Sequence, residues 1–218
     1  MNSFFKIILA ILAFLLFSLL SFLLLNIKPF ENSLENMVKN EMINSQISHE
    51  ITSILLDFRS LDTLLEVAVI FLALIGIKTI SPLFRYKPLS FPLLITDTYV
   101  SLIFPVIVIV AFYILTSGAY QSGGAFQASA ILAGGFIIIR LTKPDYLNNI
   151  KELLLRFFYS IGLLYFILIG IFTLFNGNFL EYPKEYSYYL IVSIESFLTI
   201  SLSVILANYF INGIQRFK

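Results

Sequence analysis

The stretch SGGAFQASAILAGG, Ser122–Gly135, differs in character from the bulky apolar sequence around it. It is rich in glycine and alanine, and it opens a run that is apolar enough to cross a membrane. Small residues at a helix entrance allow two backbones to approach closely. The stretch therefore predicts a packing or pathway site within a membrane helix bundle. The residues expected to face protein and not lipid are Gly123, Gly124, Ala128, Gly134 and Gly135.

Composition also places the chain in a membrane. Of its 218 residues, 59% are hydrophobic and only 12% are charged, whereas a soluble domain of this length needs a more polar surface. The chain has no cysteine, which excludes disulfides, thiolate metal sites and iron–sulfur clusters within it. Its net charge of +1 gives no electrostatic support to a nucleic-acid partner.

Six apolar segments predict an all-α, polytopic membrane protein with six transmembrane helices, because about 20 apolar residues cross the hydrocarbon core. The expected spans are 4–27, 64–80, 100–116, 124–141, 153–175 and 187–211. The first span resembles a signal peptide, but its apolar run is too long for a signal core and no small-x-small cleavage site follows. We expect it to remain as an uncleaved helix.

The distribution of lysine and arginine predicts the orientation. With six spans, ten of these residues fall on one side and four on the other. The first side holds Lys6, Lys78, Arg85, Lys87, Arg140, Lys143, Lys151, Arg156, Arg216 and Lys218, and the second holds Lys28, Lys39, Arg59 and Lys184. Positive charge concentrates on the cytoplasmic side, so both termini are expected to be cytoplasmic.

The connection between the first two spans, residues 28–61, is the longest polar stretch of the chain. Apolar residues recur at helical spacing in its second half, namely at Met42, Ile43, Ile47, Ile51, Ile54 and Leu55. This pattern predicts an amphipathic helix on the membrane surface. A solvated linker is the alternative.

Two acidic positions are candidates for ion handling, because a carboxylate within a span is costly unless it is neutral or paired. Glu195 lies about 12 Å into the last span at 1.5 Å per residue, among the hydroxyl residues Ser193, Ser196, Thr199, Ser201 and Ser203. We expect either an ion-pathway residue or a hydrogen-bonded structural glutamate there.

Glu66 lies near the start of the second span, with Asp62 one turn earlier on the same face. Asp62 is also an ion-pathway candidate, but Asp62 and Thr63 alternatively form an N-terminal cap beside which the helix dipole favours Glu66. The single histidine, His49, lies in the polar connection and is assigned no role. No metal site, cofactor site or nucleophile–base pair is expected.

The segment 99–141 resembles the MnhB family, the B subunit of Mrp-type sodium/proton antiporters. The family hallmark reads roughly H-G-H-x-x-P-G-G-G-F-Q-G-G-x-I-L-A, and residues 117–133 keep its G-G-x-F-Q-x-x-x-I-L-A skeleton, with Phe126 and Gln127 at its centre. Ser117 and Ala119 replace the two histidines and Ser122 replaces the proline. No role of that histidine pair is therefore carried over to this chain.

The sequence DTLLE at 62–66, followed by an apolar run, resembles the D-T-x-x-E motif of a small two-helix unit. In Mrp antiporters that unit ends the large A subunit, and in membrane-bound hydrogenases and sulfane reductases it is a separate, MbhE-like subunit. The proline-rich segment SPLFRYKPLSFP, 81–92, separates the two resemblances. We expect a two-helix unit over 1–84 fused to a four-helix MnhB-like module over 85–218.

The resemblance implies a membrane subunit of a multi-subunit cation/proton antiporter-type complex in the plasma membrane, contributing to Na⁺ or H⁺ translocation. Its partners would be other antiporter-like membrane subunits and the lipid bilayer. It would not be catalytic alone, although the complex can be a redox-driven pump. The alternatives are a non-conducting scaffold in the same complex and a stand-alone small transporter.

Overall fold

The computed structural model describes residues 47–80, 94–142, 151–175 and 177–214, together with scattered positions between 11 and 42. Two compact units are distinguished, Met1–Lys39 and Asn40–Lys218. The described residues of the second unit are mostly helical and contain no strand. Its helices are α3 (Glu50–Ser53), the π-helix η1 (Ile54–Phe58), α4 (Ser60–Ile80), α5 (Leu94–Ser117), α6 (Ala125–Thr142), α8 (Glu152–Leu174) and α9 (Ser187–Ile214).

Five of these helices are long and apolar enough to cross a membrane, among the residues described. They correspond to the last five predicted spans, within a few residues at most ends. Two of them begin earlier than predicted, at Ser60 and Leu94, because polar first turns lie outside the apolar window that marks the hydrocarbon core.

Several predictions fall largely or wholly on residues outside the described ranges. The predicted first span, 4–27, is described only at scattered positions from Ile11 to Leu25, all of them helical. The proline-rich segment 81–92 lies wholly outside. The predicted module boundary at residue 84 therefore stays a prediction.

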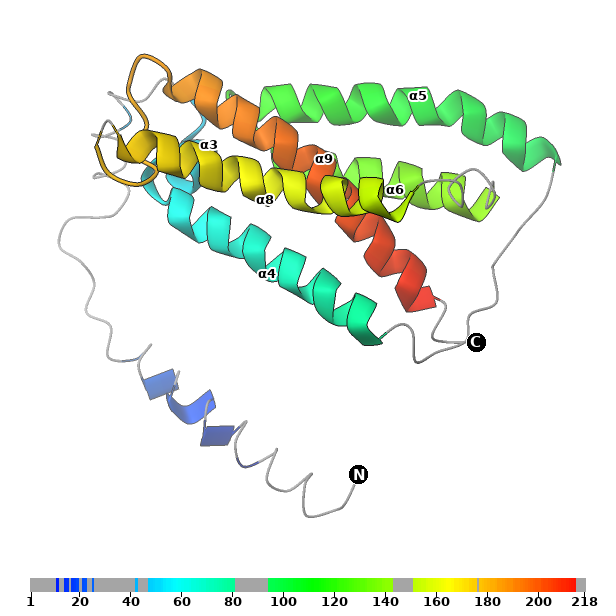
Figure 1. Ribbon diagram of the computed structural model, residues 1–218, viewed down its shortest axis with the longest axis horizontal. Helices are drawn as coiled ribbons and strands as arrows, with labels where there is room; N and C mark the ends of the chain where they lie inside the picture. Colours follow the sequence, from blue (N-terminus) through cyan, green and yellow to red (C-terminus); the bar gives the residue numbers. More distant parts are fainter. Residues whose placement is uncertain are drawn as a thin grey trace. The chain divides into compact units, whose positions relative to one another are not determined.

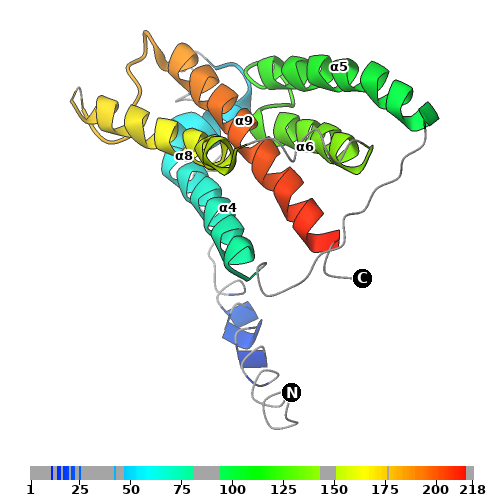
Figure 2. The ribbon, with the colours of Figure 1, turned by 45° about the vertical axis from the view of Figure 1, so that its right-hand side comes forward.

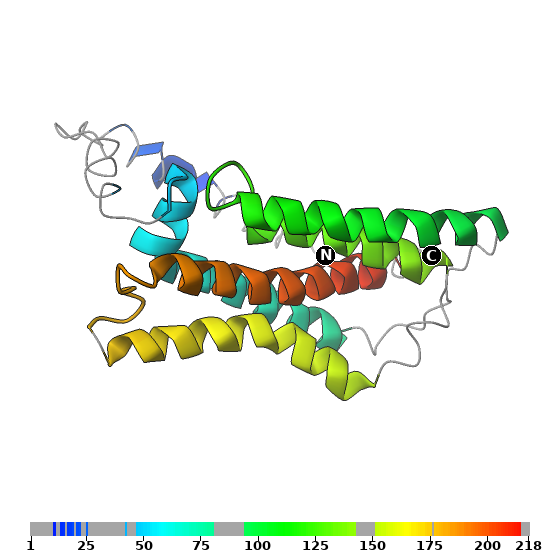
Figure 3. The same cartoon turned by 90° about the horizontal axis from the view of Figure 1, so that it is seen from above.

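Helix α9 is the centre of the second unit. It lies between α8 and the α5–α6 hairpin (Figure 3) and also contacts α4. Within the 18-residue apolar window of its membrane-crossing part, 56% of the residues are buried, against at most 28% in the corresponding windows of the other four membrane-crossing helices. A helix that is apolar all round is typical of such a buried position.

Small residues let the neighbours of α9 pack closely. A Cβ atom added to Gly162 of α8 would lie 2.7 Å from the Cβ atom of Ser201 of α9. The Ser201 hydroxyl donates a hydrogen bond of 2.7 Å to the Tyr159 carbonyl of α8. Both contacts require the close backbone approach that small residues permit in membrane bundles.

Over the described part of the polar connection, the structure does not show the predicted amphipathic surface helix. The described part, 47–59, forms α3 and the π-turn η1, and it packs onto protein through Ile47 and Leu56, which are 1% and 5% exposed. Ile51 and Leu55 remain exposed. The segment is therefore a cap over one end of the helices (Figure 1), held by buried contacts and not only by the membrane surface.

Candidate functional site

The carboxyl group of Glu195 lies inside the protein, on the side of α9 that faces α6. Glu195 is 4% exposed. The backbone N–H of Ala125, the first residue of α6, donates a hydrogen bond to this carboxyl group. The N-terminus of a helix carries unpaired N–H groups and a partial positive charge, which favour an anionic neighbour. At this site the N-terminus of α6 therefore compensates part of the charge of a buried carboxylate.

Gly124 allows this approach for two separate reasons. Its φ angle is +110°, a conformation that residues with a side chain rarely adopt. A Cβ atom at this position would also lie 2.8 Å from Oε1 of Glu195. The glycine of the family motif thus makes room for the carboxyl group.

The loop before α6 is folded tightly onto the end of α5. The Gly124 N–H donates a 3.0 Å hydrogen bond to the Ile114 carbonyl, and a Cβ atom on Gly118 would lie 2.7 Å from the Gly124 Cα atom. Glu195 lies two turns inside α9, so the loop descends to that depth. Non-helical backbone is tolerated at such depth where it is enclosed by protein or lines a cavity.

A small cavity of about 90 Å³ joins Glu195 to the motif loop. Its polar side chains are Thr52, Thr63, Gln127 and Glu195, and the other lining residues are Ile51, Leu55, Leu56, Gly123, Gly124, Ala125, Phe126 and Leu198. This volume has room for a few water molecules, for which the hydroxyl, amide and carboxyl groups would be hydrogen-bond partners. The structure thus brings Glu195 of α9 next to four residues of the family motif that lie far from it in sequence, namely Gly123, Gly124, Phe126 and Gln127.

Hydroxyl groups attach the α3–η1 cap to the same loop. Thr52 Oγ1 donates a 2.5 Å hydrogen bond to the Gly118 carbonyl, and the His49 N–H donates one of 3.2 Å to the Ala119 carbonyl. Thr63 Oγ1 of α4 donates to the Leu55 carbonyl at 2.6 Å. Thr52 and Thr63 are functional candidates that the sequence analysis missed, because isolated threonines carry no signal of their own.

His49, to which no role was assigned, lies beside this cavity. Its Nδ1 atom is 3.0 Å from Thr52 Oγ1. The single proton of that hydroxyl is directed at the Gly118 carbonyl, so Nδ1 is the donor in this pair. The histidine and Glu195 are thus both in contact with residues that line one cavity.

The predicted acidic residues of α4 do not line the cavity. Asp62 forms an ion pair with Arg59 three residues earlier, and Glu66 is exposed on the helix surface. The capping alternative also needs correction, because α4 begins at Ser60 and Asp62 and Thr63 lie within its first turn. Glu66 therefore lies on the exposed surface of α4, whereas Glu195 lies inside the protein, and the two are not part of one site.

The serine and threonine residues near Glu195 do not form a polar strip. Ser196 and Thr199 donate to carbonyls of their own helix, four residues back, and Ser203 donates to Ile200. Such bonds satisfy a hydroxyl group locally. A polar route along α9 beyond Glu195 is not provided by these side chains.

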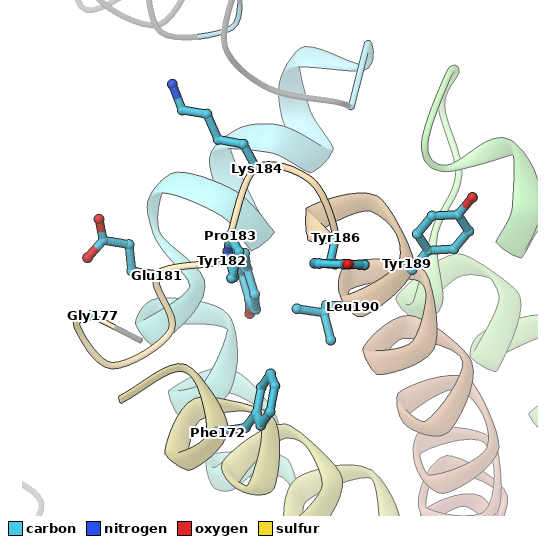
Figure 4. Close-up of a pocket in the computed structure, with 9 residues that line it drawn as sticks. All are labelled: Phe172, Gly177, Glu181, Tyr182, Pro183, Lys184, Tyr186, Tyr189 and Leu190. Atoms are coloured by element: carbon cyan, nitrogen blue, oxygen red, sulfur yellow. The ribbon is translucent and has the colours of Figure 1, made fainter. Parts of the chain in front are cut away.

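A larger open cavity of about 660 Å³ lies at the same end of the molecule, between the end of α8 and the start of α9 (Figure 4). Phe172, Tyr182 and Leu190 point into it, whereas Glu181 and Lys184 extend away from its centre. Burial raises the pKa of the Tyr182 phenol, so this group stays neutral. Among the described residues that line the cavity, none therefore offers an ion a charged ligand in its interior. In the described residues no cluster of three or more His, Cys, Asp or Glu forms a metal site.

Two sequence families match the chain. The family described as a domain related to the MnhB subunit of Na⁺/H⁺ antiporters matches residues 95–211, more than half of the chain. The MbhE family, described as one of the subunits of MBH, matches residues 2–98. No curated protein matches the chain significantly.

Two solved structures share the fold. A chain of the membrane-bound sulfane sulfur reductase, an archaeal respiratory membrane complex, aligns with a TM-score of 0.71 and 20% identity over 96% of this chain and 98% of its own. A chain of the Mrp complex from Dietzia sp. DQ12-45-1b aligns with a TM-score of 0.67 and 19% identity. That alignment covers 98% of this chain but 26% of the Mrp chain, so this chain spans about a quarter of that relative.

Replacing Gly124 with alanine is expected to destabilise the protein and displace the Glu195 carboxyl group. The positive φ angle alone costs on the order of 1–3 kcal/mol for a residue with a Cβ atom, and the contact with Oε1 adds to it. The measurement is the thermal unfolding midpoint of the full-length chain in detergent. Gly134→Ala is the matched control, because Gly134, expected to face protein, has no atom within 4 Å of an added Cβ. Equal midpoints for the two variants would contradict the assignment.

Proposed function

The chain belongs to the family of domains related to the MnhB subunit of Na⁺/H⁺ antiporters, and from this premise we propose that it is a membrane subunit of a multi-subunit cation/proton antiporter-type complex. Both sequence resemblances, to MnhB and to the MbhE-like unit, are confirmed by the two family matches. The fold shared with chains of two multi-subunit membrane complexes supports other membrane subunits as partners. We further propose that it resides in the plasma membrane and is not catalytic alone.

We propose six spans with both termini in the cytoplasm. Five helices of sufficient length and apolarity support this count, together with the apolar segment 4–27. The excess of lysine and arginine on one side supports the orientation. The cavity beside Glu195 would then open toward the non-cytoplasmic side.

Reporter fusions test this topology. A fusion after Asn40 should report the non-cytoplasmic side, and a fusion after Lys218 should report the cytoplasm, because positive residues accumulate on the cytoplasmic side. Paired reporters that are active on opposite sides, such as a periplasmic phosphatase and a cytoplasmic fluorescent protein, give the readout. The same side for both positions would rule out six spans.

Glu195 is proposed as the residue of this chain that takes part in ion movement. The observation that carries this proposal is the hydrogen bond from the α6 N-terminus to a carboxyl group that is 4% exposed and borders a polar cavity. Charge at such a position is costly, and the helix N-terminus offsets part of the cost. The carboxyl group can therefore exist with or without a proton.

The same geometry favours a proton over a sodium ion at Glu195. The partial positive charge of the α6 N-terminus stabilises the carboxylate but opposes a second cation beside it. Protonation removes the negative charge and adds no separate cation. Water that enters the cavity, together with Thr52 and His49 toward the α3–η1 cap, would offer hydrogen-bonding partners through which a proton is exchanged with the side on which the cap lies.

Glu195→Gln is expected to preserve assembly and to lower H⁺ flux, because the amide keeps the shape and accepts the Ala125 hydrogen bond but cannot release a proton. The measurement is H⁺ and Na⁺ flux in vesicles that hold the whole complex, normalised to subunit content. Glu181→Gln is the control, since Glu181 is exposed and lies in the α8–α9 connection. Undiminished flux would favour the scaffold, and loss of assembly would favour a structural role of Glu195.

Glu66 is proposed to interact with a neighbouring subunit, because its side chain is exposed on α4 and does not border the cavity beside Glu195. An isolated carboxylate on a membrane helix requires a partner or a water-filled surface. Glu66→Gln is expected to lower flux in the whole complex while the thermal midpoint of the isolated chain stays unchanged. Normal flux in the complex would remove Glu66 from the pathway.

A non-conducting scaffold is the second candidate function. It is favoured by Ser196, Thr199 and Ser203, whose hydroxyl groups bond to carbonyls of α9 itself and so do not extend a polar route along this helix beyond Glu195. If the chain conducts, partner subunits must complete the route. The same observation counts against a stand-alone transporter.

A further inference from the structure

An imidazole ring lies beside the motif loop although the motif of this chain contains no histidine. The family hallmark has histidines at two positions that are occupied here by Ser117 and Ala119. The α3–η1 cap brings His49 to this stretch of backbone, where the His49 N–H donates a 3.2 Å hydrogen bond to the Ala119 carbonyl. The cap, in cyan, lies next to the loop that joins α5 to α6 in both views (Figure 2, Figure 3). A distant part of the sequence therefore places a histidine where the motif has lost one.

Thr52 connects the His49 ring to the cavity beside Glu195. Nδ1 of His49 lies 3.0 Å from Thr52 Oγ1, and Thr52 and Glu195 both line the cavity of about 90 Å³. Thr52 and Glu195 are buried, whereas His49 is half-buried. The imidazole is thus the most exposed of the three groups, and one hydroxyl separates it from the cavity.

The imidazole has a property that the hydroxyl and amide groups of this region lack. A histidine side chain binds and releases a proton near neutral pH, whereas threonine and glutamine side chains do not change charge there. Of the described residues that line the cavity, Glu195 alone has an ionisable side chain. His49 therefore adds a second ionisable group, on the side of Thr52 that faces away from the cavity.

We propose that the α3–η1 cap supplies the imidazole of the ion site, in place of a histidine at position 119, and that His49 passes protons through the Thr52 hydroxyl to the cavity beside Glu195. This role rests on the proposed function of Glu195 in proton movement. It goes beyond that function because it names the group that takes up the proton and the residue of the motif that it replaces.

The proposed transfer balances one proton taken up against one proton released. A proton from outside binds Nε2 of His49, which is the acceptor while Nδ1 carries the ring proton. The Nδ1–H bond breaks as an O–H bond forms at Thr52 Oγ1. The earlier hydroxyl proton of Thr52 turns away from the Gly118 carbonyl, to which it is bonded at rest, and passes through a water molecule to the Glu195 carboxylate. A half-turn of the ring then restores a donor toward Thr52.

His49→Asn tests whether His49 carries a proton. The asparagine amide can still donate to Thr52 Oγ1 but cannot take up and release a proton. H⁺ flux in vesicles that hold the whole complex is expected to fall on the order of 100-fold, the lower end of the effect of one positioned proton-transferring side chain. The thermal midpoint of the full-length chain should stay unchanged. Glu50→Gln is the matched control, because Glu50 is the next residue, is exposed and does not line the cavity.

Returning the imidazole to the motif separates proton transfer from a structural role of His49. In the double variant His49→Ala, Ala119→His, the ring is attached to the residue whose carbonyl the His49 backbone contacts. H⁺ flux is expected to recover relative to His49→Ala alone. Thr52→Ser keeps the connecting hydroxyl and should keep the flux, whereas Thr52→Val removes the hydroxyl and should lower it. If the double variant does not assemble, His49→Asn and the two Thr52 variants decide.

The proposal is overturned if His49→Asn keeps the flux of Glu50→Gln, if flux and thermal midpoint fall together, if Thr52→Val keeps full flux, or if an assembled double variant shows no recovery. Glu195→Gln distinguishes this outcome from a failure of the proposed function. Lower flux in Glu195→Gln with full flux in His49→Asn would remove only the role of His49. Undiminished flux in Glu195→Gln would contradict both.

Discussion

The hydrogen bond between the Ala125 N–H and the Glu195 carboxyl group is the contact on which the arrangement of the second unit depends. It joins the start of α6 to the inside of α9, and the other features follow from this juxtaposition. Gly124 must lack a side chain, the motif loop must descend to the level of the carboxyl group, and the α3–η1 cap must cover the resulting opening. A buried carboxyl group is thereby made compatible with a membrane interior by a helix N-terminus, and no basic side chain lines its cavity among the described residues.

The sequence predicted the last five spans because hydrocarbon thickness dictates the length of an apolar run. It also singled out Gly124 and Glu195, one by its small neighbours and the other by its charge. It did not predict that they touch, since they lie 71 residues apart and hydropathy does not specify which helices are neighbours. Asp62 and Glu66 were selected by type and position along the chain, yet they do not line the cavity beside Glu195.

The sequence also did not predict that α9 is the central helix. Its apolar content resembles that of a lipid-facing helix, and only its serines and threonines distinguish it. These residues serve close packing and local hydrogen bonds, as Ser201 does against Gly162 and Tyr159. A hydroxyl group in a membrane helix thus signals a protein neighbour as readily as an ion route.

The π-turn η1 affects the direction in which the side chains of the α3–η1 cap point around the helix axis. Arg59 N–H bonds to the Ile54 carbonyl five residues back, so the turn holds one residue more than an α-helical turn would. One residue corresponds to a rotation of about 100° around a helix axis. The extra residue therefore sets the angle at which His49 and Thr52 meet the motif loop. A homologue one residue shorter here would carry the same side chains but present them to a different neighbour.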